Sequence, residues 1–250
     1  NKMLTHFSLF TGIGGIDLAA EWAGFTTVGQ CEYADYPTRV LEKHWPDVPR
    51  WRDIRDVTAE SVRARGIGEI TLVSGGFPCQ PFSEAGKQGG RSDNRYLWPE
   101  MRKIILELRP NWVFGENVTG IIGLALDEVL SDLENLEYSA TAFIVPACAV
   151  GAWHIRERVI ILAHTDNPRL QAGRKKRIRD DQTIHGRRAD TKHLHQIKES
   201  ISIPGREAWK AEPGICRVDD GPPDWVDRLK CLGNAVVPQQ VYPILAAIAE

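Results

Sequence analysis

The sequence predicts an α/β fold, and two patterns carry this prediction. Between Leu4 and about His164, short apolar runs of strand length alternate with longer helical stretches. This alternation is typical of a parallel sheet with crossover helices. The first apolar run leads into a glycine-rich turn, Gly12-Ile-Gly-Gly15, as is common where a strand passes into a helix beside a ligand. We therefore expect one sheet with helices on both of its faces.

The individual elements follow from the same periodicity. The strand candidates are Leu4–Phe10, Thr27–Glu32, Ile70–Ser74, Trp112–Glu116, Ala140–Val145 and Val159–Ala163, with a further short strand ending at Asp53-Ile54. The helical candidates between them are Gly15–Ala23, Tyr36–Lys43, Pro99–Leu108 and Leu124–Leu133. Helical character returns near Asp224, and Val236–Ala249 predicts an apolar terminal helix packed against the first strand.

Composition limits the class of protein. With 250 residues, 42% of them hydrophobic, the chain can form one large or two small domains. No apolar run is long enough to cross a bilayer and the N-terminal residues lack a signal-peptide pattern, so we expect a cytoplasmic protein without a membrane contact. The cysteines are dispersed and form no Cys-x-x-Cys pair, which argues against disulfides and a structural zinc site. No metal is expected.

Charge is distributed unevenly along the chain. Residues 165–210 hold twelve Lys and Arg against six Asp and Glu, a net +6, whereas the remainder carries −8. Such a basic segment in an acidic body indicates either a contact with a polyanion or a solvated surface loop.

One cysteine stands in an unusual context. Cys79 follows the strand candidate Ile70–Ser74 and lies between Pro78 and Pro81, ahead of a glycine-rich loop. In open α/β sheets, ligands bind at the carboxyl ends of the strands. The prolines fix the backbone around the thiol without packing it into a core. We interpret Cys79 as a nucleophile rather than as a small buried hydrophobic residue.

The first turn predicts a nucleoside site. Its spacing is not Gly-x-Gly-x-x-Gly, because the third glycine would fall on Asp17, and this disfavours a dinucleotide. Glu32 ends the next strand, where a carboxylate can bind a ribose diol. Together these features indicate a nucleoside cofactor without a pyrophosphate, and S-adenosylmethionine is the candidate.

Two further motifs place charged residues at the ends of predicted strands. Glu116 ends the strand Trp112–Glu116 and would lie beside Cys79 if the two strands are neighbours. Burial there would raise its pKa and suit it to proton donation, although a helix-capping role is the alternative. Arg156 and Arg158 alternate before the last strand candidate and could hold a base or a phosphate, or form surface salt bridges.

These motifs, in this order, resemble those of the DNA (cytosine-5) methyltransferases. The resemblance covers about residues 1–164 and 215–250. It rests on Gly12-Ile-Gly-Gly15, Glu32, Asp53-Ile54, Pro78-Cys79-Gln80, Glu116-Asn117-Val118, Arg156-Glu-Arg158 and Gly233-Asn-Ala-Val-Val-Pro238. One departure is His154, which stands where the family usually has glutamine.

The resemblance implies a Rossmann-like, S-adenosylmethionine-dependent methyltransferase sheet with a small irregular insert for target recognition. Residues 1–164 would form the catalytic and cofactor-binding domain, 165–215 a short basic target-recognition segment, and 216–250 the C-terminal return of the catalytic domain. The implied catalytic residues are Cys79, Glu116, Arg156 and Arg158. The implied cofactor-binding residues are Phe10, Gly12, Gly14, Glu32, Asp53, Ile54, Pro78, Asn234 and Val236.

The implied activity is methyl transfer to carbon 5 of a cytosine that has been flipped out of double-stranded DNA, through a covalent Cys79 adduct. We expect a monomer of prokaryotic or phage type, with a separate cognate restriction endonuclease as one possible companion. Because the insert is short, transfer RNA stays open as the substrate. A non-catalytic nucleic-acid-binding protein that keeps the fold is a third hypothesis, against which the intact Cys79, Glu116 and Arg158 count. A nicotinamide-dependent oxidoreductase ranks last, since the glycine spacing fails.

Overall fold

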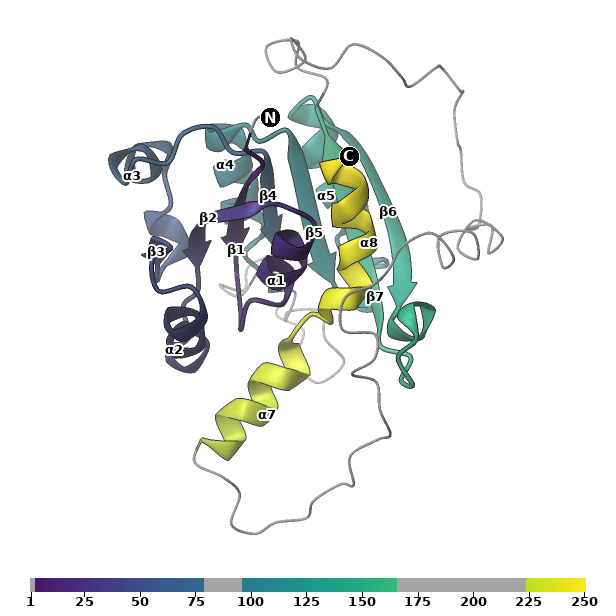
Figure 1. Cartoon of the computed structure of the whole chain (residues 1–250). Helices are drawn as coiled ribbons and strands as arrows, with labels where there is room; N and C mark the ends of the chain where they lie inside the picture. The colour runs from purple at the N-terminus through teal and green to yellow at the C-terminus, as the bar shows by residue number, and fades with distance from the viewer. Residues whose placement is uncertain (1–2, 79–95, 166–223) are drawn as a thin grey trace.

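The computed structural model describes residues 3–78, 96–165 and 224–250, which form a seven-stranded sheet in the order β3-β2-β1-β4-β5-β7-β6 (Figure 1). The strands are β1 (Thr5–Leu9), β2 (Thr26–Cys31), β3 (Arg50–Trp51), β4 (Leu72–Gly75), β5 (Trp112–Asn117), β6 (Ser139–Pro146) and β7 (Glu157–His164). All six main strand candidates are confirmed. The short extra strand ends at Trp51, and Ile54 instead begins a 3-10 helix, Ile54–Asp56.

The sheet is only partly parallel, which corrects the expectation of a wholly parallel sheet. Strands β3, β2, β1, β4 and β5 are parallel, whereas β7 runs antiparallel to both β5 and β6. The connection from β6 to β7 holds only a 3-10 turn, Ala147–Val150, and a short loop. A parallel pair needs a crossover of a dozen or more residues, so this short connection closes a hairpin instead.

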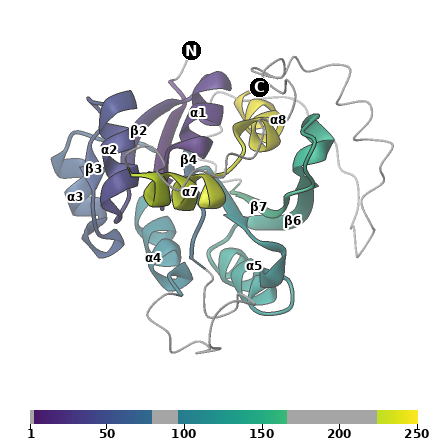
Figure 2. The ribbon, with the colours of Figure 1, turned by 90° about the horizontal axis from the view of Figure 1, so that it is seen from below.

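Helices cover both faces of the sheet, as expected (Figure 2). On one face lie α1 (Gly15–Trp22) and α8 (Pro238–Ala249), and on the other α3 (Ala59–Ala64), α4 (Trp98–Leu108) and α5 (Leu126–Asn135). The remaining helices are α2 (Asp35–His44) and α7 (Trp225–Asn234). The terminal helix α8 packs on α1, and its buried residues share one apolar cluster with Leu72 of β4, Phe114 of β5 and Ile160 of β7.

Helix α3 was not expected from the sequence. It is only six residues long and begins with a capping box, in which the side chains of Thr58 and Ser61 each bond the other residue's backbone N–H. This pair satisfies two of the N–H groups that a helix start leaves free. A helix of this length gives too little periodicity to detect.

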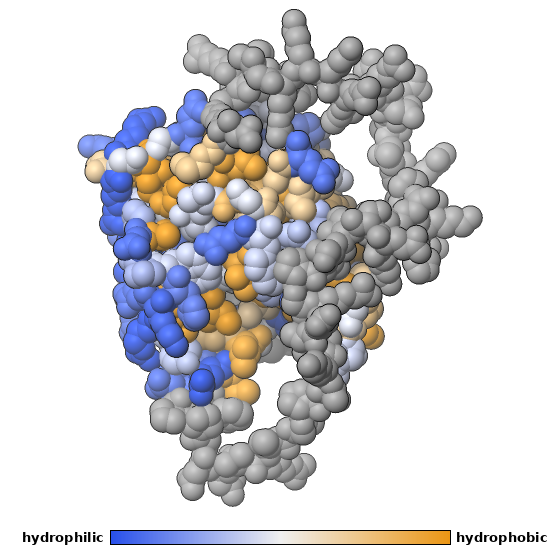
Figure 3. Space-filling model, in the orientation of Figure 1, coloured by the Kyte–Doolittle hydropathy of each residue, from blue (hydrophilic) through white to orange (hydrophobic). Residues whose placement is uncertain are grey.

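Helix α7 has a surface of mixed character. Val226, Leu229 and Leu232 are exposed on it, and hydrophobic and hydrophilic side chains alternate over this part of the molecule (Figure 3).

Within the described residues no single helix is long and apolar enough to cross a membrane. Only the segments Val226–Asn234 and Pro238–Ala249, bent by 41° at their junction, reach that length and composition together.

The topology fixes where a ligand can bind. The chain order reverses between β1 and β4, which is the switch point at which open α/β sheets form a crevice beyond their strand ends. The carboxyl ends of β1, β2, β4 and β5 meet at this edge, and because β7 is antiparallel, its first residues lie there too. Helix α7 crosses the same edge when the molecule is seen from below (Figure 2).

A buried polar network supports this edge from behind. Asp17 is fully buried at the start of α1, where its carboxylate accepts hydrogen bonds from Ser8 Oγ at 2.9 Å and Gln30 Nε2 at 2.8 Å. Gln30 in turn accepts two hydrogen bonds from Arg50 at 2.9 Å. The network therefore joins β1, β2 and β3 to α1, beside the turn that carries Gly12.

We expect Asp17 to make stability fall as pH rises from about 4 to 6. Burial raises the pKa of this carboxyl from 3.8 to about 6. Between these values the folded chain holds a proton that the unfolded chain has lost, so folding is favoured at the acidic end. Asp17→Asn keeps the shape without the titration. Relative to this variant, the wild type should lose about 3 kcal/mol of unfolding free energy between pH 4 and pH 7.

Urea unfolding of both proteins across this pH range measures the difference. Asp47→Asn, at an exposed position, serves as the matched control. Because it keeps Asp17, its stability should fall with pH as that of the wild type does. A wild-type to Asp17→Asn difference that stays constant with pH would contradict the assignment.

Candidate functional site

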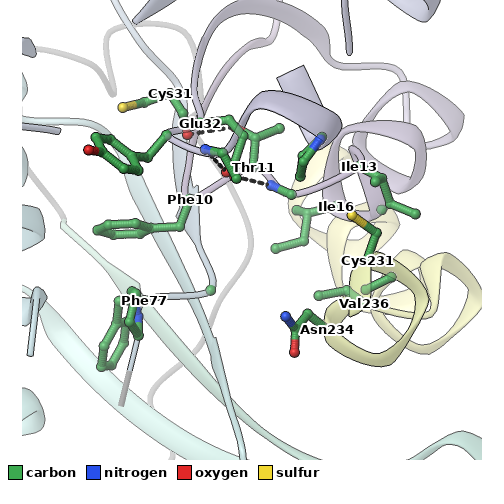
Figure 4. Close-up of a pocket in the computed structure, with 18 of the residues that line it drawn as sticks. Phe10, Thr11, Ile13, Ile16, Cys31, Glu32, Phe77, Cys231, Asn234 and Val236 are labelled. Carbon is green, nitrogen blue, oxygen red and sulfur yellow. Dashed lines mark hydrogen bonds between the residues drawn. The ribbon is translucent and has the colours of Figure 1, made fainter. Parts of the chain in front are cut away.

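A cavity of about 1160 Å³ opens at the carboxyl edge of the sheet, at the switch point (Figure 4). Its lining comes from the turn after β1, the ends of β2, β4 and β5, the start of β7, and helix α7 with the loop that follows. The cavity thus brings together ten of the residues singled out from the sequence: Phe10, Gly12, Glu32, Asp53, Ile54, Pro78, Glu116, Arg158, Asn234 and Val236.

The turn after β1 forms one end of the cavity. Phe10 and Gly12 have positive φ angles of 52° and 58°, which carries the chain away from the strand in a tight turn. Gly12 N–H donates to Glu32 Oε2 at 2.7 Å, and Ala34 N–H donates to Glu32 Oε1 at 2.8 Å. The Glu32 carboxylate is therefore fixed by two backbone groups and keeps further lone pairs for a ligand.

Two glycines of this turn serve packing. Gly14 does not line the cavity; it has a φ angle of 86°, and a Cβ there would lie 2.5 Å from the Trp45 ring. A Cβ on Gly15 would lie 2.5 Å from the carbonyl oxygen of Val236. The absence of a side chain at Gly15 thus lets α1 approach the loop between α7 and α8. Val236, in this loop, lines the cavity.

The walls combine apolar and polar surface. Figure 4 shows Phe10 and Phe77 on one side of the cavity and Ile16, Asn234 and Val236 on the other. Ile54 is buried, and Asp53 begins its 3-10 helix by accepting a hydrogen bond from Arg55 N–H at 2.9 Å. Flat apolar walls suit a purine, and a fixed carboxylate suits a ribose diol. The residues present therefore fit the nucleoside of S-adenosylmethionine.

Glu116 and Arg158 form a buried ion pair in the same cavity. Strands β5 and β7 are neighbours, and Arg158 Nε lies 2.8 Å from Glu116 Oε1, with exposed side-chain fractions of 15% and 10%. Burial raises the pKa of Glu116, against the opposing effect of Arg158 and Arg156. A Cβ on Gly76 would lie 3.1 Å from Glu116 Oε2, so the chain after β4 passes directly beside this carboxyl.

Arg156 lies near this pair but is directed elsewhere. It does not line the cavity, and its Nη2 donates to the carbonyl oxygens of Gly233 at 2.9 Å and Ala235 at 2.6 Å. The sequence placed both arginines on one face. The structure gives them different partners, a carboxylate for Arg158 and backbone carbonyls for Arg156.

Cys79 lies outside the described residues, as does the basic segment from residue 166 onward. The chain leading to Cys79 is nevertheless placed as far as Pro78. Asn117 Nδ2 donates to the carbonyl oxygen of Phe77 at 2.9 Å, which ties this segment to the end of β5. The expectation that the Cys79 and Glu116 strands are neighbours is confirmed, because β4 pairs with β5.

Several residues of the site carried no strong sequence signal. Asn117 was seen as part of a motif but given no role, and Asp227, Lys230 and Cys231 of α7 line the cavity without belonging to any motif. The amphipathic pattern of α7 could have indicated a helix, but not which face meets the cavity. In the part of the chain that is described, no group of three or more His, Cys, Asp or Glu side chains could hold a metal ion.

Comparison with known proteins adds independent observations. The family model for C-5 cytosine-specific DNA methylases matches residues 4–211. Type II methyltransferase M.HhaI of Haemophilus parahaemolyticus is 32% identical over 173 residues, covering 67% of this chain and 51% of that protein. M.AluI of Cellulosimicrobium cellulans is 35% identical over 181 residues, covering 65% and 34%. The chain thus spans between a third and a half of the length of these two relatives.

Solved structures agree on the fold. A putative DNA modification methyltransferase encoded within a prophage of E. coli superposes with a TM-score of 0.57 at 24% identity, covering 66% of this chain and 48% of that one. A mutant of DNMT2 from Spodoptera frugiperda gives 0.55 at 21% identity, covering 70% and 53%. These similarities confirm the Rossmann-like α/β architecture. The family match across most of the sequence, together with this fold, shows that the chain belongs to the C-5 cytosine-specific DNA methylases.

Proposed function

We propose that this protein transfers a methyl group from S-adenosylmethionine to carbon 5 of cytosine in double-stranded DNA. The observation that carries the proposal is the placement of the Glu116–Arg158 ion pair in the same cavity as Glu32 and the glycine turn. One cavity can then hold both a nucleoside cofactor and a target base. Family membership and the Type II methyltransferase relatives support the same reaction.

The cofactor half of the cavity would hold S-adenosylmethionine, which supplies an electrophilic methyl group when bound. Glu32 would accept hydrogen bonds from the ribose hydroxyls, and Phe10, Asp53 and Ile54 would surround the adenine. Asn234 at the end of α7 and Val236 in the loop after it would contact the methionine portion. Gly12, Gly14 and Pro78 would shape the chain around the cofactor, Gly14 by admitting the Trp45 ring against the turn.

The chemical problem on the base side is that carbon 5 of cytosine is a poor nucleophile. Attack of the Cys79 thiolate on carbon 6 forms a carbon–sulfur bond and moves the ring electrons toward N3, leaving enamine character at carbon 5. Carbon 5 would then take the methyl group, with S-adenosylhomocysteine as the leaving group, and a base would remove the carbon-5 proton. The electrons of that carbon–hydrogen bond restore the 5,6 double bond, and Cys79 leaves as the thiolate.

Glu116 and Arg158 would stabilise the charge that develops on the ring. A protonated Glu116 can donate to N3, and its raised pKa, caused by burial, favours the protonated form. Arg158 has further N–H groups beyond the Nε that contacts Glu116, and these can hold the flipped base. Base flipping is part of the proposal because stacking covers the ring face inside a duplex.

The basic segment 165–215 is proposed to contact the DNA. Its lysines and arginines suit phosphate oxygens, which fix position more than they read sequence. A role in restriction–modification or phage self-modification, in the cytoplasm where the DNA lies, belongs to the same proposal. So do a monomeric state and a cognate endonuclease that acts separately.

The proposal is tested by methyl transfer from tritiated S-adenosylmethionine to mixed-sequence duplex DNA, with bulk transfer RNA in parallel. Label at carbon 5 of cytosine in DNA is the expected result. Label confined to RNA would overturn the choice of substrate. Cofactor binding without label in either would overturn the catalytic assignment and leave a nucleic-acid-binding protein.

Cys79→Ser should abolish turnover, by more than roughly 10³-fold, because a hydroxyl is a far weaker nucleophile than a thiolate. Cofactor affinity should stay close to that of the wild type, since the substitution only exchanges one sulfur atom for oxygen. Steady-state kinetics and calorimetry with S-adenosylhomocysteine measure the two quantities. Normal turnover in this variant would exclude the covalent mechanism.

Glu116→Gln should lower kcat by about 100-fold and change its pH profile. Glu116 donates only while protonated, so wild-type kcat should fall as pH rises through its raised pKa. Glutamine has no such proton to lose, and the residual activity of the variant should lack this falling limb. Glu134→Gln, at an exposed position on α5, is the control. A variant profile parallel to that of the wild type would assign the falling limb to another group.

A further inference from the structure

Arg156 and Gln240, which we call the clasp, fasten residues 233–237 to the β6–β7 hairpin. These residues are the last two of α7 and its connection to α8, and together we call them the loop. Arg156 Nη2 donates to the carbonyl oxygens of Gly233 at 2.9 Å and Ala235 at 2.6 Å. Gln240, in the first turn of α8, donates from Nε2 to the carbonyl oxygen of Arg156 at 2.9 Å and to that of Val145. Each segment therefore holds the other through side-chain to backbone bonds.

The two segments carry different halves of the site. The loop bears Asn234 and Val236, which line the cofactor side of the cavity, and the hairpin bears Arg158, which pairs with Glu116. The bonds of the clasp join residues 77 to 95 positions apart in the chain. Together with the contact of Val236 with Gly15, these bonds hold the loop against the hairpin that carries Arg158.

Gln240 has the features of an orienting residue. Its side chain is 1% exposed, and its Oε1 has no hydrogen-bond partner among the described residues. A buried amide oxygen without a hydrogen-bond partner costs free energy of folding. We therefore attribute the orientation of the Gln240 amide to the two hydrogen bonds that its Nε2 donates. The two carbonyl oxygens it reaches lie at the end of β6 and just before β7, where the hairpin closes.

The side chain of Arg156 likewise binds backbone groups of the protein itself. Both hydrogens of Nη2 are used on carbonyl oxygens, and the residue does not line the cavity. Its φ angle of 32° lies in the left-handed region, where residues other than glycine are strained. A residue keeps such a backbone conformation only when the contacts around it hold it there. Such an arginine is poorly placed to contact a base or a phosphate directly.

We infer that Arg156 and Gln240 are positioning residues that set the Asn234–Val236 loop for cofactor binding, so that Arg156 acts through this loop and not on the DNA. The inference rests on the proposed function, because it takes the loop to be part of the cofactor site. It separates the two arginines of the motif into one that holds the base and one that holds the loop.

The test uses Arg156→Lys, which keeps the charge but loses the planar fork, and Gln240→Met, which keeps the volume but loses the donor. The affinity for S-adenosylhomocysteine should fall about tenfold in both. The affinity for DNA, and its dependence on salt, should match the wild type. Arg158→Lys should show the reverse pattern, with kcat reduced and cofactor affinity kept. Arg63→Lys, at an exposed position on α3, is the neutral control.

A second measurement does not depend on the cofactor. Hydrogen exchange of the backbone amides at residues 233–237 should be faster in both clasp variants than in the wild type, while exchange in β1 and β4 stays the same. Thermal unfolding checks that the variants are folded.

Unchanged hydrogen exchange at residues 233–237, or unchanged cofactor affinity in the clasp variants, would overturn the inference. So would weaker DNA binding by Arg156→Lys with a salt dependence whose slope is reduced by about one, because this change marks the loss of a phosphate contact. A wild type that binds no cofactor would overturn the proposed function instead. The exchange measurement would still decide whether the clasp holds the loop.

Discussion

The antiparallel pairing of β7 with β5 is the constraint on which the site depends. In this register Glu116 lies opposite Ile160 and Asn117 opposite Val159. Arg158 therefore reaches the sheet edge where β5 ends. A parallel β7 would carry its first residues to the opposite edge, a strand length away. The hairpin that joins β6 to β7 thus adds to the parallel strands an antiparallel one that presents a cation to a buried carboxyl.

The other half of the site depends on close backbone approaches. Gly15 lets the carbonyl of Val236 approach α1, and Gly76 lets the chain pass Glu116 Oε2. Asp17 holds the strands behind the turn by accepting from Ser8 and Gln30. These close contacts hold together segments that lie far apart in the sequence and that form or support the cavity walls.

The sequence was informative where the determinants are local. The strands, the glycine turn and the acids Glu32 and Glu116 could be predicted because periodicity and strand ends are visible in a short window. The antiparallel hairpin was missed because apolar runs do not record direction. The partners of Arg156 could not be predicted either, since Gly233 and Gln240 reach it only through the folded chain.

The buried Glu116–Arg158 pair is better explained by chemistry than by stability. Removing both charges from water costs energy that their attraction only partly returns, so well-packed apolar residues would often serve the fold equally well. Burial also works against the charged form of Glu116, and Arg158 only partly offsets this. A carboxyl held in this balance can accept from the guanidinium when ionised or donate to a ring nitrogen when protonated. An apolar pair could do neither, which is why we interpret the pair as retained for the reaction.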